Sequence, residues 1–100
     1  MSLLDIREYT TLAKDQDGRP LAAGQEPAAA GQQVTFTATA GQSAAFGSTT
    51  RFVRLHANGN CRILFGDNPT ATATSPRMAA GASEYFGVAP GQKVSAIDAT

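Results

Sequence analysis

The clearest pattern along the chain is the alternation of apolar and polar residues that is typical of β-strands. In segment 33–39, Val34, Phe36 and Ala38 would lie on one face of a strand and threonines on the other. Segment 4–13 is rich in β-branched and aromatic residues and is expected to form the first strand. The pattern therefore predicts extended strands rather than amphipathic helices.

Turn-forming residues interrupt the apolar stretches at short intervals, with five to ten residues between neighbouring turns. This spacing is typical of a β-sandwich or barrel. The alanine-rich segment 21–31 is divided by Gly24 and Pro27 into pieces too short for a stable helix. Segment 75–81 has a candidate N-cap, a proline at N1 and a final glycine, and it allows one helical turn. We therefore predict an all-β fold: an antiparallel β-sandwich, Ig-like or jelly-roll-like, with roughly six to eight short strands and little or no helix.

The Asn58-Gly59 pair predicts a hairpin between the strands 51–57 and 61–66, and the length of its loop decides which side chains share a face. A two-residue turn would mix apolar and charged residues on both faces. A three-residue loop instead gathers six apolar residues on one face: Val53, Leu55, Ala57, Cys61, Ile63 and Phe65. Their joint burial should outweigh the turn preference, at about 1.5–3 kcal/mol for each large side chain. The odd-length loop is therefore expected.

A second hairpin is predicted at Pro90-Gly91, which suits the centre of a type II turn between strands 84–88 and 93–98. Such pairing would place apolar side chains on both faces: Phe86, Val88 and Ile97 on one, and Tyr85, Val94 and Ala96 on the other. This hairpin would be either central in the fold or covered by another subunit. The predicted core of the domain consists of Val34, Phe36, Val53, Leu55, Cys61, Ile63, Phe65 and Phe86.

The length and composition of the chain limit its architecture and its class of partner. One hundred residues suit one domain, and we expect residues 1–100 to form a single β-sandwich domain. The formal net charge is zero, so neither nucleic acid nor an anionic membrane is expected as a partner. No apolar run approaches the roughly 18 residues of a membrane span, and no signal peptide is expected. Cys61 is the only cysteine, which excludes an intrachain disulfide and favours synthesis in a reducing compartment.

The residues that catalysis would need are nearly absent from the sequence. Segment 41–45 begins like a nucleophile elbow, but Ala45 stands where the second glycine is required. His56 is the only histidine, and the hairpin parity places Cys61 on the opposite face from it. A structural zinc site needs about four ligands of the His, Cys or carboxylate type. We therefore expect no enzyme activity, no catalytic, cofactor-binding or metal-binding residues and no cofactor, with Cys61 in the core.

One face of the predicted hairpin is the best candidate for an interaction surface. It would carry Phe52, Arg54, His56, Arg62 and Leu64. Arginine and aromatic residues are enriched at the centres of interfaces. The alternative is a solvated face on which long side chains shield the two apolar residues. The sequence leaves both interpretations open.

Two stretches of the chain carry a family resemblance. They read FVRLHANGNCRILFGDNPTATATS, from residue 52, and MAAGASEYFGVAPGQKVSAI, from residue 78. They resemble a group of small tailed-bacteriophage and prophage proteins that are encoded among virion morphogenesis genes near the major capsid protein. The resemblance implies a β-sandwich component of the virion, a capsid decoration or head-accessory protein, made in the bacterial host cytoplasm. It carries no catalytic or metal-binding residue.

We therefore expect a non-enzymatic structural protein that associates with itself and with the virion shell, through the major capsid protein or other virion proteins. The alternative is a ligand- or carbohydrate-binding module of a phage tail or fibre. Against it, the chain has no tryptophan and only Tyr9 and Tyr85 as tyrosines with which to form a sugar platform. The apolar residues of segment 84–98 predict a homo-oligomer, a dimer or trimer, whose interface includes Tyr85 or Ile97.

Overall fold

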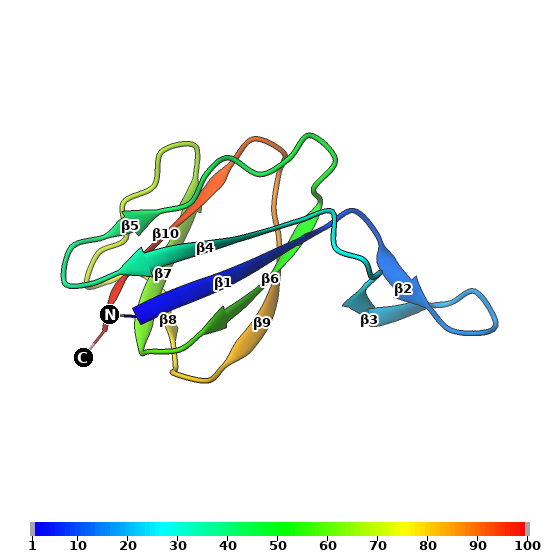
Figure 1. The fold of residues 1–100 in the computed structure, drawn as a ribbon, viewed down its shortest axis with the longest axis horizontal. Coiled ribbons are helices and arrows are strands. Elements are labelled where there is room, and N and C mark those ends of the chain that lie inside the picture. Colours follow the sequence, from blue (N-terminus) through cyan, green and yellow to red (C-terminus); the bar gives the residue numbers. More distant parts are fainter. Residues whose placement is uncertain (1, 100) are drawn as a thin grey trace.

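The computed structural model describes residues 2–99, and within this range the chain forms ten strands and no helix (Figure 1). The strands are β1 (Ser2–Tyr9), β2 (Leu12–Lys14), β3 (Pro20–Gly24), β4 (Ala30–Phe36), β5 (Gly41–Gln42), β6 (Phe52–Ala57), β7 (Cys61–Gly66), β8 (Arg77–Met78), β9 (Ser83–Gly87) and β10 (Lys93–Asp98). Sheet 1 has the order β4-β1-β6-β9 and sheet 2 the order β5-β10-β7-β8, while β2 and β3 form a separate hairpin. All of these pairings are antiparallel, so the predicted all-β fold is confirmed.

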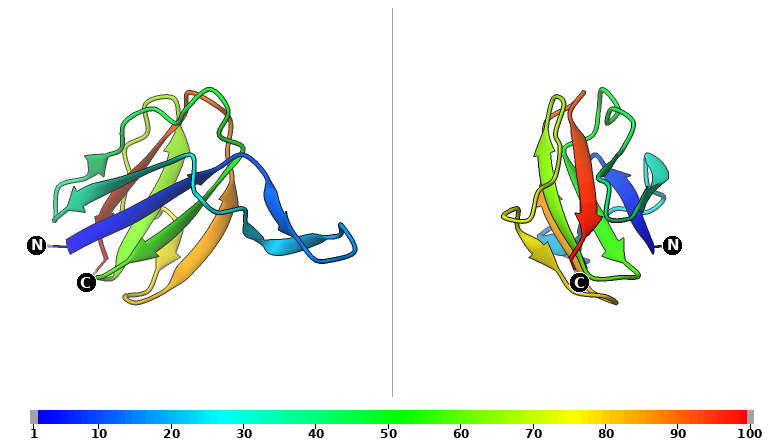
Figure 2. Two further views of the ribbon diagram at one scale, coloured as in Figure 1. Left: turned by 45° about the vertical axis from the view of Figure 1, so that its right-hand side comes forward. Right: turned by 90° about the vertical axis from the view of Figure 1, so that its left-hand side faces the viewer.

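The two four-stranded sheets pack face to face around one apolar core (Figure 2, right). Along β6, Val53, Leu55 and Ala57 are fully buried, whereas the residues between them are half-buried on the outer face. Of the predicted core residues, only Phe65 and Phe86 are partly rather than fully buried, and both pack against the core. The prediction left out several buried members of the core: Leu4, Ile6, Phe46, Met78, Val94 and Ala96.

The predicted hairpin between β6 and β7 is wrong, because the two strands belong to opposite sheets. β6 pairs with β1 and β9, whereas β7 pairs with β10 and β8. Loop 58–60 therefore crosses from one layer of the sandwich to the other. The predicted parity is nevertheless right, since Val53, Leu55 and Ala57 face the same core as Cys61 and Ile63. A strand that crosses the core shows the same alternation as one that pairs within its sheet.

The Asn58-Gly59 pair serves this crossing rather than a tight hairpin turn. Positive φ angles occur at Gly18, Gly81 and Gly91 but not at Gly59, which excludes the left-handed conformation of a type I′ turn there. A Cβ on Gly59 would lie 2.5 Å from the Ser2 Oγ, so a larger residue there would have to displace the Ser2 side chain of β1. The Asn58 Oδ1 also accepts a hydrogen bond of 2.7 Å from the Leu3 amide, which ties the loop to the same strand.

The second predicted hairpin is also wrong, although its turn is present. The Gln92 amide donates to the Ala89 carbonyl at 3.3 Å, and Gly91 has a φ of +83°, as a type II turn requires. However, β9 lies in sheet 1 and β10 in sheet 2. Because the two strands lie in different sheets, each directs a different one of the two predicted apolar faces toward the core. Tyr85 and Ile97 consequently lie on opposite outer faces of the sandwich.

The predicted first strand, 4–13, is interrupted after β1, and its second part pairs with β3. In the turn between β2 and β3, the Asp15 carboxylate accepts hydrogen bonds of 2.9 Å from two backbone amides. We call residues 12–24 the arm. The arm extends away from the sandwich, and the molecule measures 46 × 26 × 21 Å as a result (Figures 1 and 2).

The helical turn that segment 75–81 allowed is replaced by strand β8. Cys61 of β7 is the strand partner of Met78, and the Met78 side chain is buried in the core. Burial of a large apolar side chain contributes about 1.5–3 kcal/mol. An isolated helical turn gains far less because its nucleation is unfavourable.

Candidate functional site

The outer faces of the two sheets differ in how much of them is covered. On sheet 2, the loop 67–76 lies over the strands: the Ala71 amide donates to the Ser95 Oγ at 2.9 Å, and both residues are buried. Arg62 donates from its Nη1 to the Ser75 carbonyl at 2.9 Å, which fixes the far end of the same loop. The outer face of sheet 1 instead forms an open groove, and it is the better candidate for a binding site.

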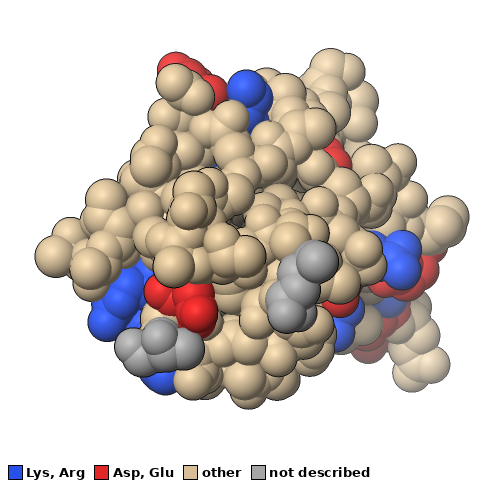
Figure 3. Space-filling model, turned by 60° about the vertical axis from the view of Figure 1, so that its left-hand side comes forward, with Lys and Arg blue, Asp and Glu red and all other residues tan. Residues whose placement is uncertain are grey.

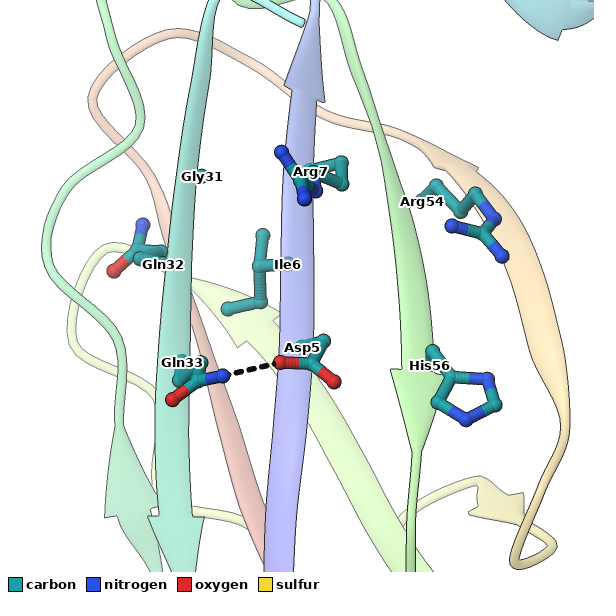
Figure 4. Close-up of a pocket in the computed structure, with 8 residues that line it drawn as sticks. All are labelled: Asp5, Ile6, Arg7, Gly31, Gln32, Gln33, Arg54 and His56. Atoms are coloured by element: carbon teal, nitrogen blue, oxygen red, sulfur yellow. Dashed lines mark hydrogen bonds between the residues drawn. The ribbon is translucent and has the colours of Figure 1, made fainter.

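The groove has a volume of about 710 Å³ and runs across β4, β1 and β6 (Figure 4). Its lining is mainly polar and consists of Asp5, Ile6, Arg7, Gly31, Gln32, Gln33, Arg54 and His56. Strand register sets the order of these groups, because Arg7 is opposite Arg54 and Asp5 is opposite His56. On the other side of β1, Gly31 is opposite Arg7, so no side chain from β4 fills the groove there.

Hydrogen bonds fix several of these side chains. The Asp5 Oδ1 accepts a bond of 2.7 Å from the Gln33 Nε2. The His56 Nδ1 lies 2.7 Å from the Ser83 Oγ, and the Arg54 Nη2 donates to the same oxygen at 3.4 Å. Arg7 leans the other way, over Gly31 (Figure 4). The two guanidinium groups therefore point apart, Arg7 toward β4 and Arg54 toward β9, while the Asp5 carboxylate lies on the central strand β1 (Figure 4).

An aromatic cluster lies at the end of sheet 1 next to the arm. The Tyr9 and Phe52 rings are stacked with centroids 5.4 Å apart, and Tyr85 is tilted against both at 6.2 and 5.9 Å. Burial and a hydrogen bond to Glu26 raise the pKa of Tyr9 to about 12. The Gly24 amide donates to the Tyr85 hydroxyl at 3.2 Å, so the cluster also fastens the base of the arm.

A smaller apolar pocket of about 260 Å³ opens at the side of the sandwich between β7 and β9. It is lined by Ile63, Leu64, Phe65, Pro76 and Phe86. The pocket exists because β8 pairs with β7 only at the first two residues of β7, and because β9 is an edge strand. The same opening explains why Phe65 and Phe86 are only partly buried.

The predicted interaction surface is divided between the two sides of the molecule, so its assignment to one face is wrong. Phe52, Arg54, His56 and Tyr85 lie on the outer side of sheet 1. Arg62, Leu64 and Ile97 lie on the outer side of sheet 2. The cause is again the crossing between β6 and β7, which separates residues that a hairpin would have joined.

Sequence reasoning missed the part of the groove that β1 and β4 provide. Asp5 and Arg7 alternate with the buried Leu4 and Ile6, and this alternation is a signal that could have placed them on an outer face. The alternation could not predict which residues of β6 lie opposite Asp5 and Arg7. This pairing depends on the register between strands almost fifty residues apart along the chain.

Two titratable groups lie inside the sandwich. The Glu8 Oε1 accepts hydrogen bonds of 2.8 Å from the Gly47 amide and the Thr50 hydroxyl, so this buried carboxylate anchors the loop before β6. Cys61 is buried, as predicted, and burial raises the pKa of its thiol. Both groups serve the packing of the sandwich.

Between Ser2 and Ala99 there is no cluster of three or more His, Cys, Asp or Glu residues able to hold a metal ion. The same part of the chain has no helix long and apolar enough to cross a membrane. No protein-family model, curated protein or solved structure matches the chain.

Proposed function

We propose that this chain is a non-enzymatic structural protein of a phage particle, made in the bacterial host cytoplasm and located in the virion. It acts by binding copies of itself and the virion shell, as a capsid decoration or head-accessory protein. The resemblance of segments 52–75 and 78–97 to small virion proteins supports this class. The observation that carries the mode of action is the projecting arm with its exposed leucines.

The arm presents apolar surface that the monomer does not cover. Leu12 and Leu21 are 41% and 44% exposed, and both belong to the arm. A two-stranded hairpin alone is only marginally stable in water, so the arm gains stability from a partner that covers it. Burial of each leucine would contribute about 1.5–3 kcal/mol.

The free edge of sheet 1 offers a second contact of the same kind. β9 has no strand partner on its outer side within the part of the chain that the structure describes. Its Tyr85 is 42% exposed, and Leu64, on the rim of the apolar pocket next to β9, is 38% exposed. Exposed edge strands are commonly covered by association. A dimer or trimer that covers Tyr85 and the arm would bury three of the large exposed apolar side chains, Leu12, Leu21 and Tyr85.

Light scattering at micromolar concentrations tests the self-association. We expect a mass that is a small multiple of the 10.3 kDa chain. The double variant Leu12→Ser/Leu21→Ser should shift the mass toward the monomer, because it removes only exposed apolar side chains. Ala22→Ser is the matched control, because Ala22 is exposed and lies next to Leu21 on β3. A wild-type protein that stays monomeric throughout this range would exclude the oligomer.

The genes that flank the coding sequence test the class of protein separately. Capsid and portal genes next to it would support a virion component. A cluster of metabolic genes with no phage genes nearby would argue against it, whatever the oligomeric state.

The open groove favours a second candidate, a ligand- or carbohydrate-binding module of a phage tail or fibre. Tyr85, which is partly exposed, is the strand neighbour of Arg54 in the polar lining, and the two together could contact a sugar. A glycan array distinguishes the candidates. Binding that Tyr85→Ala abolishes would favour this module, whereas an array without hits favours the structural role.

A further inference from the structure

We propose that the groove on sheet 1 binds an oxyanion, a carboxylate or phosphate group, between Arg7 and Arg54. The site lies across β1 and β6 rather than on the arm, and so it goes beyond the self-association proposed above. Three features of the groove support this site: the strand register, the free space between the two side chains, and the charge of the lining.

The register places two cations directly opposite each other on neighbouring strands. Like charges in this arrangement destabilise a sheet. The pair is not the by-product of a generally basic surface, because the formal net charge of the chain is zero. On the face drawn in Figure 3, charged residues also form small groups of mixed sign rather than one basic patch. A local cost of this kind is offset when an anion lies between the two cations.

The two guanidinium groups leave room for such an anion. Arg7 lies over Gly31, and its Nη1 is 3.5 Å from where a Cβ on that glycine would be. Arg54 points toward β9, where its Nη2 makes one long bond to Ser83. The side chains thus stand on either side of the groove (Figure 4). Each guanidinium has five N–H donors, so most of them are free for a ligand.

The charge of the lining favours a ligand with one or two negative charges. Asp5 also lines the groove, but its carboxylate is bound by Gln33 at the side away from Arg54. With His56 neutral, Arg7, Arg54 and Asp5 leave one uncompensated positive charge. A guanidinium binds planar carboxylates and phosphates through paired, charge-assisted hydrogen bonds. The groove extends well beyond a single oxyanion, so the group would belong to a larger ligand.

Titrations followed by two-dimensional amide NMR test the site. Inorganic phosphate, acetate and chloride, each added at constant ionic strength, are the probes. We expect phosphate or acetate to cause saturable shifts at the amides of 5–7, 31–33 and 54–56, and chloride to cause none. Tighter binding of phosphate than of acetate would identify a phosphate ligand. Tighter binding of acetate would identify a carboxylate ligand.

Variants assign the binding to the two arginines. Arg7→Gln and Arg54→Gln should each weaken binding about tenfold, the loss that follows from one charge-assisted hydrogen bond. Arg77→Gln, at an exposed position of β8 on sheet 2, is the matched control and should bind like the wild type. Arg54→Lys keeps the positive charge but removes the paired N–H donors of the guanidinium, so it should also bind more weakly. The rest of its NMR spectrum should be unchanged. Linear shifts without saturation, or equal losses in Arg54→Gln and Arg77→Gln, would overturn the proposal.

Discussion

At the scale of single residues, the contact between Gly24 and Tyr9 fixes the base of the arm. A Cβ on Gly24 would lie 2.4 Å from carbons of the Tyr9 ring, which is far inside van der Waals contact. The ring cannot move away easily, because it is stacked on Phe52. Its hydroxyl is also bound to the Glu26 carboxylate at 2.5 Å. One glycine therefore allows the arm, the Glu26 loop and sheet 1 to meet.

The substitution Gly24→Ala should destabilise the protein by about 1–3 kcal/mol, because it overpacks this contact. Gly87→Ala is the matched control, since a Cβ at that strand position meets no atom within 4 Å. It should change stability by less than about 0.5 kcal/mol. Urea unfolding measures both variants. Equal stabilities would show that the Tyr9 ring yields to the added methyl group.

The hydroxyl of Tyr9 should make stability sensitive to alkaline pH. Burial and Glu26 raise its pKa to about 12 in the folded state, against about 10 in an unfolded chain. The resulting stabilisation is complete below about pH 10 and is lost as the pH rises to about 12. The loss should be on the order of 1–3 kcal/mol.

Urea unfolding at about pH 8 and about pH 11.5 measures this alkaline loss. In Tyr9→Phe the loss should be smaller than in the wild type, because the titrating group is gone. The same alkaline decrease in both proteins would assign it to other groups.

At the scale of elements, the arm and the sandwich differ in how they are held together. The arm is stabilised by its own turn and by the aromatic cluster at its base, and its outer residues are exposed. The sandwich shares one continuous core. The arm should therefore open locally without unfolding of the sandwich.

Asp15→Ala should accelerate amide hydrogen exchange in the arm and leave the sandwich unchanged. The substitution removes the carboxylate that accepts two amide hydrogen bonds in the turn. The free energy of global unfolding should change by less than about 0.5 kcal/mol, as for other exposed sites outside the core. Exchange monitored by NMR separates the two effects. Faster exchange in β1 or β6 as well would show that arm and sandwich open together.

The elements also show what local pattern can and cannot predict. The alternation in β6 and β7 identified the strands and their inward side chains correctly. In β4 it was right for Val34 and Phe36 but wrong for Ala38, because the strand ends at Phe36 and Ala38 is exposed in the bend that follows. It could not show that β6 and β7 cross the core, because crossing and pairing give the same period of two residues. The groove was unpredictable for a related reason: Arg7 and Arg54 meet only through long-range register.

At the scale of the whole molecule, the side opening of the sandwich should determine the cost of core substitutions. Leu55 is completely buried in a central strand, so Leu55→Ala should cost about 2–5 kcal/mol. Phe65 packs against Phe46 and Phe86 but borders the apolar pocket. For a fully buried phenylalanine, truncation to alanine costs about 3–5 kcal/mol. Partial burial places the expected cost at the lower end of that range.

Chemical denaturation of the two variants checks this order. Leu55→Ala should lose more unfolding free energy than Phe65→Ala for each contact that is removed. The reason is that the surroundings of a fully buried side chain cannot relax to fill the cavity. A cost below about 1 kcal/mol for Phe65→Ala would show that the pocket side of the core contributes little to stability.

The crossings between the layers have a consequence for how fast the chain folds. In sheet 1, β1 must find β6, with Leu4 opposite Ala57, before any of the central ladder exists. In sheet 2, β10 enters between β5 and β7 from the other end of the chain. Such non-local pairing requires costly loop closure first, and all-β domains of this type fold in milliseconds to seconds. The arm is a local hairpin, which forms in about 1–10 microseconds, so it can be sampled many times before the sandwich that holds it has closed.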